Sequence, residues 1–183
     1  MSLLLGINGS FCARFILLAG LLAITGAGVV KAQELDYRAQ SLFIYKFTRY
    51  VYWPAERTEG SFRIGVMGDS PIVEELEIMA SLKKAGNDQE IEVVQLEAED
   101  AISDLHLLYV ASSQSREIKA ISEAAGSAPV LIVAERSGLA RKGAVISFIV
   151  TDEGILKFEI NLEALEAREL DIADELLRLG FPI

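Results

Sequence analysis

Strands and helices alternate along most of this chain, and that alternation limits the possible folds more than any other feature. Apolar runs of strand length are followed by segments whose apolar residues recur every three or four positions, as in helices. The run at 129–134 is apolar throughout, which is typical of a strand buried on both faces of a parallel sheet. We therefore expect a three-layer α/β domain with a mostly parallel, Rossmann-like sheet and flanking helices.

The expected elements follow one another in a regular order. The first is a helix at 35–51, which ends there because Pro54 disfavours helical geometry at Trp53. A helix at 72–80 is expected to be capped by Ser70 and to begin with Pro71. The other expected elements are strands at 62–67, 90–96, 105–110 and 129–134, a short helical turn at 99–103 and a helix at 116–125.

The end of the chain departs from this alternation. Strands are expected at 144–151 and 155–160, separated only by Asp152, Glu153 and Gly154. Because so short a loop joins only antiparallel neighbours, we expect a C-terminal hairpin that closes one edge of the sheet. Asn161 is expected to cap a helix at 162–168, and a last helix is expected at 172–179.

The first 32 residues carry the pattern of a secretory signal peptide. Arg14 is the charged side chain that precedes the apolar run 15–30, and the small-residue end Val30-Lys31-Ala32 suits cleavage after Ala32. An uncleaved anchor is the alternative, although the run is shorter than the roughly 20 residues that a spanning helix needs. We expect residues 33–183 to form a single domain exported to the periplasm.

Composition excludes several classes of function for that domain. Without Arg14 and Lys31, the 17 basic side chains fall to 15 against 27 acidic ones, a net charge near −12. Such a charge repels nucleic acid. The single cysteine, Cys12, is removed together with the signal peptide, so neither a disulfide nor a thiolate metal site is expected in the mature domain.

The chain offers few groups for catalysis. His106 is the one histidine, and its apolar strand favours a structural role over a catalytic one. A triad of His106 with Asp69 and Ser70 has no support beyond residue type, because there is no nucleophile-elbow motif. We therefore expect no enzyme, no cofactor and no metal site. The crevice at the strand ends near Gly68, Asp69 and Ser70 is kept as a weak candidate for a small ligand.

Aromatic residues crowd the first helix and the segment after it. The apolar or small residues at helical spacing are Ala39, Leu42, Phe43, Phe47, Tyr50 and Val51, and the aromatic run comprises Tyr45, Phe47, Tyr50, Tyr52 and Trp53. One helix face cannot bury all of these rings. Either half of them are scattered on the surface, or they form an aromatic patch for a partner, since tyrosine and tryptophan are enriched at interfaces.

Several segments together resemble the YfiR family of periplasmic proteins. One is the helix segment Ala39–Pro54. The others are the strand opening Phe62–Gly68, the segment 130–135 with Gly138 and Gly143, the strand 146–150, and 158–162 followed by 176–179. The resemblance implies an α/β domain that dimerises and binds the periplasmic sensor domain of a membrane-bound diguanylate cyclase or sensor kinase, restraining its output. It also implies an outer-membrane lipoprotein as a further partner. The family's repressor carries disulfides, which this mature chain lacks.

The excess of aromatic residues on the first helix and of apolar residues near the C-terminus predicts where a partner binds. Both segments are expected on the same flank of the sheet. The residues predicted to border the dimer or partner interface are Tyr45, Arg49, Tyr52, Trp53, Glu159, Leu170 and Arg178. Arginine beside aromatic rings suits such a surface because its flat guanidinium stacks and still donates hydrogen bonds. A periplasmic domain that binds a small ligand is the alternative function.

Overall fold

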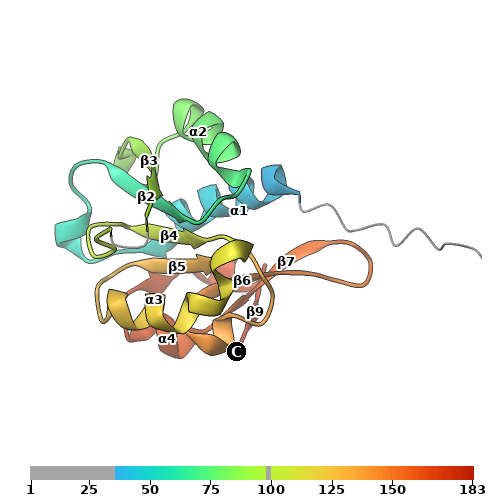
Figure 1. The fold of residues 1–183 in the computed structure, drawn as a ribbon. Coiled ribbons are helices and arrows are strands. Elements are labelled where there is room, and N and C mark those ends of the chain that lie inside the picture. The colour runs from blue at the N-terminus through green and yellow to red at the C-terminus, as the bar shows by residue number, and fades with distance from the viewer. Residues whose placement is uncertain (1–35, 98–99) are drawn as a thin grey trace, which may run out of the picture. The chain divides into compact units, whose positions relative to one another are not determined.

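The computed structural model describes residues 36–97 and 100–183, shown in colour in Figure 1. The predicted signal peptide, Cys12 and the cleavage site after Ala32 lie outside these residues. Within them, no helix combines the length and the apolar character needed to cross a membrane.

A seven-stranded sheet forms the centre of the domain, with strands in the order β3-β2-β4-β5-β6-β7-β9. The first five strands in this order are parallel, β6 and β7 are antiparallel, and β9 is parallel to β7. The bounds are β2 Phe62–Met67, β3 Ile91–Leu96, β4 Leu107–Val110, β5 Leu131–Ala134, β6 Ile146–Val150, β7 Leu156–Ile160 and β9 Phe181–Pro182. The expected α/β fold with a C-terminal hairpin is therefore confirmed.

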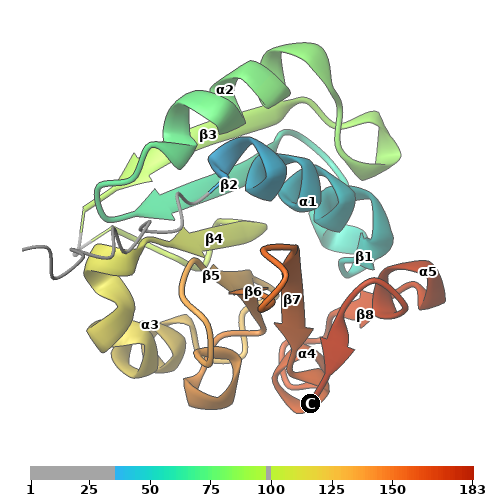
Figure 2. The ribbon, with the colours of Figure 1, turned by 90° about the vertical axis from the view of Figure 1, so that its right-hand side faces the viewer.

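Helices cover both faces of this sheet, which makes three layers (Figures 1 and 2). On one face, α1 (Tyr37–Tyr50) and α2 (Ile72–Leu82) pack against side chains such as Ile64 and Leu107. On the other, α3 (Ile118–Ala125) packs against their strand neighbours, such as Leu108. Successive strand residues point to opposite faces. A strand such as β5 is therefore apolar at every position because both of its faces are covered.

Helix α1 buries a face that agrees only in part with the expected one, because Phe47 is buried as expected but other positions differ. Leu42 and Tyr50 are exposed, whereas Gln40 and Thr48 are buried. The reason is the helix's position across the sheet: Gln40 lies over β4, where its side-chain oxygen accepts a hydrogen bond from the Tyr109 hydroxyl at 2.7 Å. A polar partner in the sheet therefore overrides the apolar pattern of the helix.

The helix starts are close to the expected positions. Pro71 already has helical backbone angles, and the Ile72 amide lies 3.4 Å from the Ser70 hydroxyl oxygen, consistent with a capping serine. Asn161 caps α4 (Leu162–Glu166) by accepting a hydrogen bond from the Ala164 amide. Helix α3 is preceded by the 3₁₀ helix η3 (Ser112–Glu117), so the expected helix at 116–125 is split.

Two expected elements differ in the structure. The last helix, α5, covers only Asp174–Leu177, because Ile172 belongs to β8 (Asp171–Ile172). That strand pairs antiparallel with β1 (Val51–Tyr52), a partner from the far end of the chain that helical periodicity does not reveal. The described part of the expected turn at 99–103, residues 100–103, contains bends and a turn but no helix.

The remaining 3₁₀ helices lie in connections. They are η1 (Ala55–Arg57), η2 (Gly86–Asp88) and η4 (Ala140–Lys142). The 3₁₀ helix η4 connects β5 to β6 and forms part of the surface near α3.

Candidate functional site

His106 is held in a structural role immediately before β4. The Arg63 amide donates to its Nδ1 at 3.0 Å, and its Nε2 lies 2.8 Å from the Arg57 carbonyl oxygen, so a neutral ring with a proton on Nε2 satisfies both contacts. The ring stacks on Phe62, with centroids 4.6 Å apart. Burial lowers the pKa of His106. Both nitrogens are occupied, so this imidazole is poorly suited to act as a general base.

The sheet keeps His106 apart from Asp69 and Ser70. Strands β2 and β4 are parallel and adjacent, with Ile64 opposite Leu107. His106 therefore lies at the amino end of the pair, whereas Asp69 and Ser70 follow the carboxyl end of β2. At about 3.3 Å per residue, the separation along the strands is roughly 20 Å. The three residues do not form a triad.

The crevice predicted at Gly68 is bounded on one side by the segment that follows β4. Gly68 has φ +90, and a Cβ at this position would lie 2.6 Å from the Ser113 Oγ and 2.7 Å from the Gln114 Cγ. Asp69 is exposed beside this contact and Ser70 is buried. Beside it lies an open hollow of about 490 Å³ that is lined by Gly68, Asp69, Gln114 and residues of β3. Its role in ligand binding stays a prediction.

A cluster of buried polar groups lies where the amino end of α1 crosses the carboxyl ends of β4 and β5. Glu135, buried after β5, accepts hydrogen bonds from the Tyr37 hydroxyl at 3.1 Å and from the Ser112 amide at 2.7 Å. Burial and the nearby Glu135 carboxylate raise the pKa of both Tyr37 and Tyr109, so these phenols remain neutral donors. The cluster fixes α1 on the sheet.

Three of the residues predicted to bind a partner lie around one hollow at the other end of α1. Arg49, Tyr52 and Trp53 line a cavity of about 200 Å³ together with Arg57. Arg49 is exposed, and its Nη1 donates to the Ala85 carbonyl oxygen at 3.1 Å. Trp53 is half-buried, because its Nε1 donates to the His106 carbonyl oxygen and its ring packs edge-on against Phe62. Arg49 and Tyr52 are therefore the more accessible members.

The structure also brings the C-terminal segment beside this end of α1, as expected. Tyr52, 53% exposed, is paired with Asp171, and the Ala173 amide donates to the Tyr50 carbonyl oxygen at 2.9 Å. Helix α5 lies next to α1 (Figure 2) and is followed by the exposed Arg178. Leu170, in contrast, is buried in the core beneath this surface.

Two predicted residues lie apart from that group. Tyr45 is half-buried in the middle of α1, where the Lys83 ammonium lies 5.8 Å from its ring centroid. Glu159 alternates along β7 with Phe158 and Ile160, which belong to the core under α1. Its side chain therefore lies on the opposite face of the sheet, where it accepts a hydrogen bond from the Ser147 hydroxyl at 3.1 Å.

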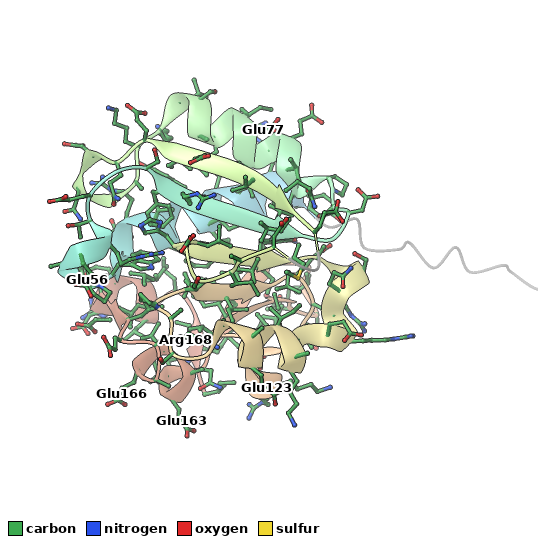
Figure 3. All side chains as sticks on the ribbon, turned by 60° about the vertical axis from the view of Figure 1, so that its left-hand side comes forward. Glu56, Glu77, Glu123, Glu163, Glu166 and Arg168 are labelled. Atoms are coloured by element: carbon green, nitrogen blue, oxygen red, sulfur yellow. The ribbon has the colours of Figure 1, made fainter. Side chains whose placement is uncertain are left out.

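Grouped acidic, histidine or cysteine ligands for a metal are not found in residues 36–97 and 100–183. Instead, acidic side chains such as Glu77, Glu163 and Glu166 project outwards (Figure 3). The surface of the domain has hollows and exposed aromatic and arginine side chains, which suit binding of a partner or ligand.

The fold is that of a doubly wound α/β domain with a mostly parallel sheet. Residues 37–180 match the model of the family DUF4154, described as YfiR/HmsC-like. The chain therefore belongs to the YfiR/HmsC-like family, whose members are generally non-catalytic regulators. No curated protein matches the chain in a sequence comparison.

Proposed function

We propose that this protein is a periplasmic regulator that binds the sensor domain of an inner-membrane signalling protein, such as a diguanylate cyclase, and holds its output low without catalysing a reaction. The observation that carries the proposal is the family match, which covers nearly the whole of the described domain. Membership of the YfiR/HmsC-like family implies a regulator of this type.

The exposed residues near β1 and α5 support a binding role. Arg49, Tyr52 and Arg178 come from segments far apart in the sequence that β1, β8 and α5 bring to one flank. Tyrosine and arginine are enriched among the residues that dominate binding energy at protein interfaces. We therefore propose this flank as the partner-binding surface. The half-buried Trp53 and the buried Leu170 pack behind it.

A pull-down of the tagged, exported protein from solubilised envelopes tests the proposal. The parent protein is expected to capture a membrane protein with a periplasmic sensor domain, and deletion of its gene is expected to raise cyclic di-GMP. Capture of no membrane signalling protein, together with unchanged cyclic di-GMP, would refute the regulatory function.

Single arginine variants test the surface separately. Arg49→Ala and Arg178→Ala are expected to weaken capture while changing stability by about 0.5 kcal/mol or less, as is usual for surface substitutions. Arg38→Ala is the matched control, because Arg38 is exposed at the opposite end of α1. If both variants capture the partner as well as Arg38→Ala does, the proposed surface is wrong even though the function stands.

Export is part of the same proposal. N-terminal sequencing of protein from the periplasm is expected to begin at or within a few residues of Gln33. Full-length protein recovered from the cytosol would contradict it. The expected homodimer is tested by sedimentation of the purified protein, and an outer-membrane lipoprotein partner by its presence in the same pull-down.

A small-ligand-binding sensor is the second candidate function. It is favoured by a hollow near α3 that is lined with basic residues. None of these lining residues belongs to the proposed partner-binding surface. The two functions are compatible, since a ligand bound at one surface can bias binding at another.

A further inference from the structure

Four basic side chains gather around one hollow on the α3 side of the sheet. The hollow has a volume of about 470 Å³, and its lining consists of Ser115, Arg116, Ile118, Lys119, Arg136, Ser137, Leu139 and Lys142. None of these described lining residues is acidic. The chain as a whole has 17 basic and 27 acidic side chains, so this concentration of positive charge runs against its composition.

The fold assembles this group from three separate segments. Arg116 and Lys119 belong to η3 and the start of α3, Arg136 follows β5, and Lys142 ends η4. Gly143 allows the last of these segments to approach α3, because a Cβ there would lie 2.9 Å from the Ser122 Cβ. Its φ of +129 also favours glycine.

The position is one where ligands bind in folds of this kind. Arg136 and Ser137 lie two and three residues beyond Ala134, the last residue of β5, and Ser115 and Arg116 belong to the segment that follows β4. In doubly wound α/β sheets, ligands bind outside the carboxyl ends of the strands. The hollow's volume also falls within the range of small-molecule sites, about 300–1,000 Å³.

A buried hydroxyl gives a second, independent indication of a ligand. Ser115 is 6% exposed and lines the hollow, and its Oγ has no hydrogen-bond partner within the described part of the chain. Leaving a buried hydroxyl without a partner costs about 1–3 kcal/mol. Because the Ser115 Oγ is out of reach of water, the side chain must rotate towards the hollow before the acceptor oxygen of a ligand can satisfy this donor.

The basic groups are free to meet such a ligand. Lys119 is paired with Glu123 at 3.7 Å, but both side chains are largely exposed, at 81% and 68%, so this pair is weak. Arg116, Arg136 and Lys142 are exposed and form no ion pair with any described residue. Residues 36–97 and 100–183 therefore do not neutralise these charges through ion pairs.

We propose that this hollow binds the phosphate group of a ligand. Arginine binds phosphate through two parallel hydrogen bonds, lysine adds a compact positive charge, and the Ser115 hydroxyl donates to a phosphate oxygen. Ile118 and Leu139 provide an apolar wall for the remainder of the ligand. The proposal is independent of the regulatory function and of the flank around Tyr52.

Calorimetric titration of the purified protein with inorganic phosphate and with glycerol 3-phosphate tests this site, at constant ionic strength in chloride buffer. Saturable binding is expected. The double variant Arg136→Ala/Lys142→Ala is expected to bind at least tenfold more weakly. Arg141→Ala, which removes a neighbouring charge that does not line the hollow, is the matched control and is expected to bind as the parent does.

Ser115→Ala distinguishes a ligand contact from a structural role. It is expected to weaken phosphate binding several-fold without lowering the melting temperature of the ligand-free protein, because it removes a hydroxyl that lacks a partner. A lower melting temperature with unchanged phosphate affinity would count against the proposed contact.

The source of the phosphate is distinguished by a vesicle arm. Sedimentation with phosphatidylcholine vesicles containing phosphatidylglycerol is compared with pure phosphatidylcholine vesicles. Binding to the anionic vesicles alone, lost in the double variant, assigns the phosphate to a lipid headgroup; binding to glycerol 3-phosphate assigns it to a soluble ligand. No binding in either arm, or equal loss in Arg141→Ala and the double variant, overturns the proposal.

Discussion

Arg168 holds the end of α3 against the segment that follows α4, and its removal provides the sharpest test of how this domain is stabilised. The side chain is buried, and its guanidinium donates to the Gly126 carbonyl oxygen and, at 3.3 and 2.8 Å, to the carbonyl and hydroxyl oxygens of Ser122. Figure 3 shows Arg168 between the two helices. A cation is favourable there because carbonyl dipoles accumulate at the C-terminus of a helix.

The expected loss follows from these contacts. Hydrogen bonds to a charged group contribute about 1.5–3 kcal/mol each. Gly126 is exposed and Ser122 half-buried, so water replaces part of what Arg168→Ala removes. Burial also disfavours the charge and lowers the pKa of Arg168, which reduces the net benefit. We therefore expect Arg168→Ala to lower the free energy of unfolding by about 2–3 kcal/mol in total.

Urea denaturation and thermal melting measure this loss. For a domain of this size the melting temperature is expected to fall by about 5–10 °C, at roughly 2–4 °C per kcal/mol. Arg168→Met, which keeps an apolar stem but not the donors, is expected to lose nearly as much, because the loss comes from the hydrogen bonds. Arg141→Ala is the exposed control, expected within about 0.5 kcal/mol of the parent. If Arg168→Ala is no less stable than Arg141→Ala, the contacts with α3 do not stabilise the domain.

Three further predictions concern the sheet and its neighbours. Folding lowers the pKa of His106, so the unfolded chain binds more protons than the folded one when the pH falls through the unfolded-state pKa near 6.5. The free energy of unfolding should therefore decrease below that pH. Urea titrations at pH 5 and 7.5 should show that a His106→Gln variant loses part of this dependence. Tyr109→Phe alone should cost about 1–3 kcal/mol by leaving Gln40 without its partner, whereas adding Gln40→Leu should recover most of that loss; a purely additive double variant would contradict the pairing. Gly68→Ala should lower the melting temperature, because φ is +90 and the new Cβ would clash with Ser113, and an unchanged melt would show that the two loops separate easily.

The order of strands and helices could be predicted from the sequence because it depends on local patterns. The apolar segment of β5, the short loop between β6 and β7 and the capping Asn161 each act over a few residues, and each was found where expected. The structural role of His106 also followed from its apolar surroundings, although its two hydrogen-bond partners did not.

The features that the sequence concealed all depend on partners distant in the chain. Ile172 has the periodicity of a helix but lies in β8, because Val51 provides a strand partner. Gln40 is buried in place of Leu42 because Tyr109 lies beneath it.

The residues at the candidate sites show the same division. Composition and spacing singled out Arg49 and Tyr52, and strand pairing then placed Tyr52 opposite Asp171. The basic hollow was not predicted, although a basic residue close after a buried parallel strand, as at Arg136, is a signal for it in the sequence. Local sequence thus determined most of the helices and the strands of the main sheet, since periodicity and capping act within a few residues. Only tertiary packing decided which side chains meet, because the charges around Arg136 and the contacts of Arg168 come together only when separate segments fold onto one sheet.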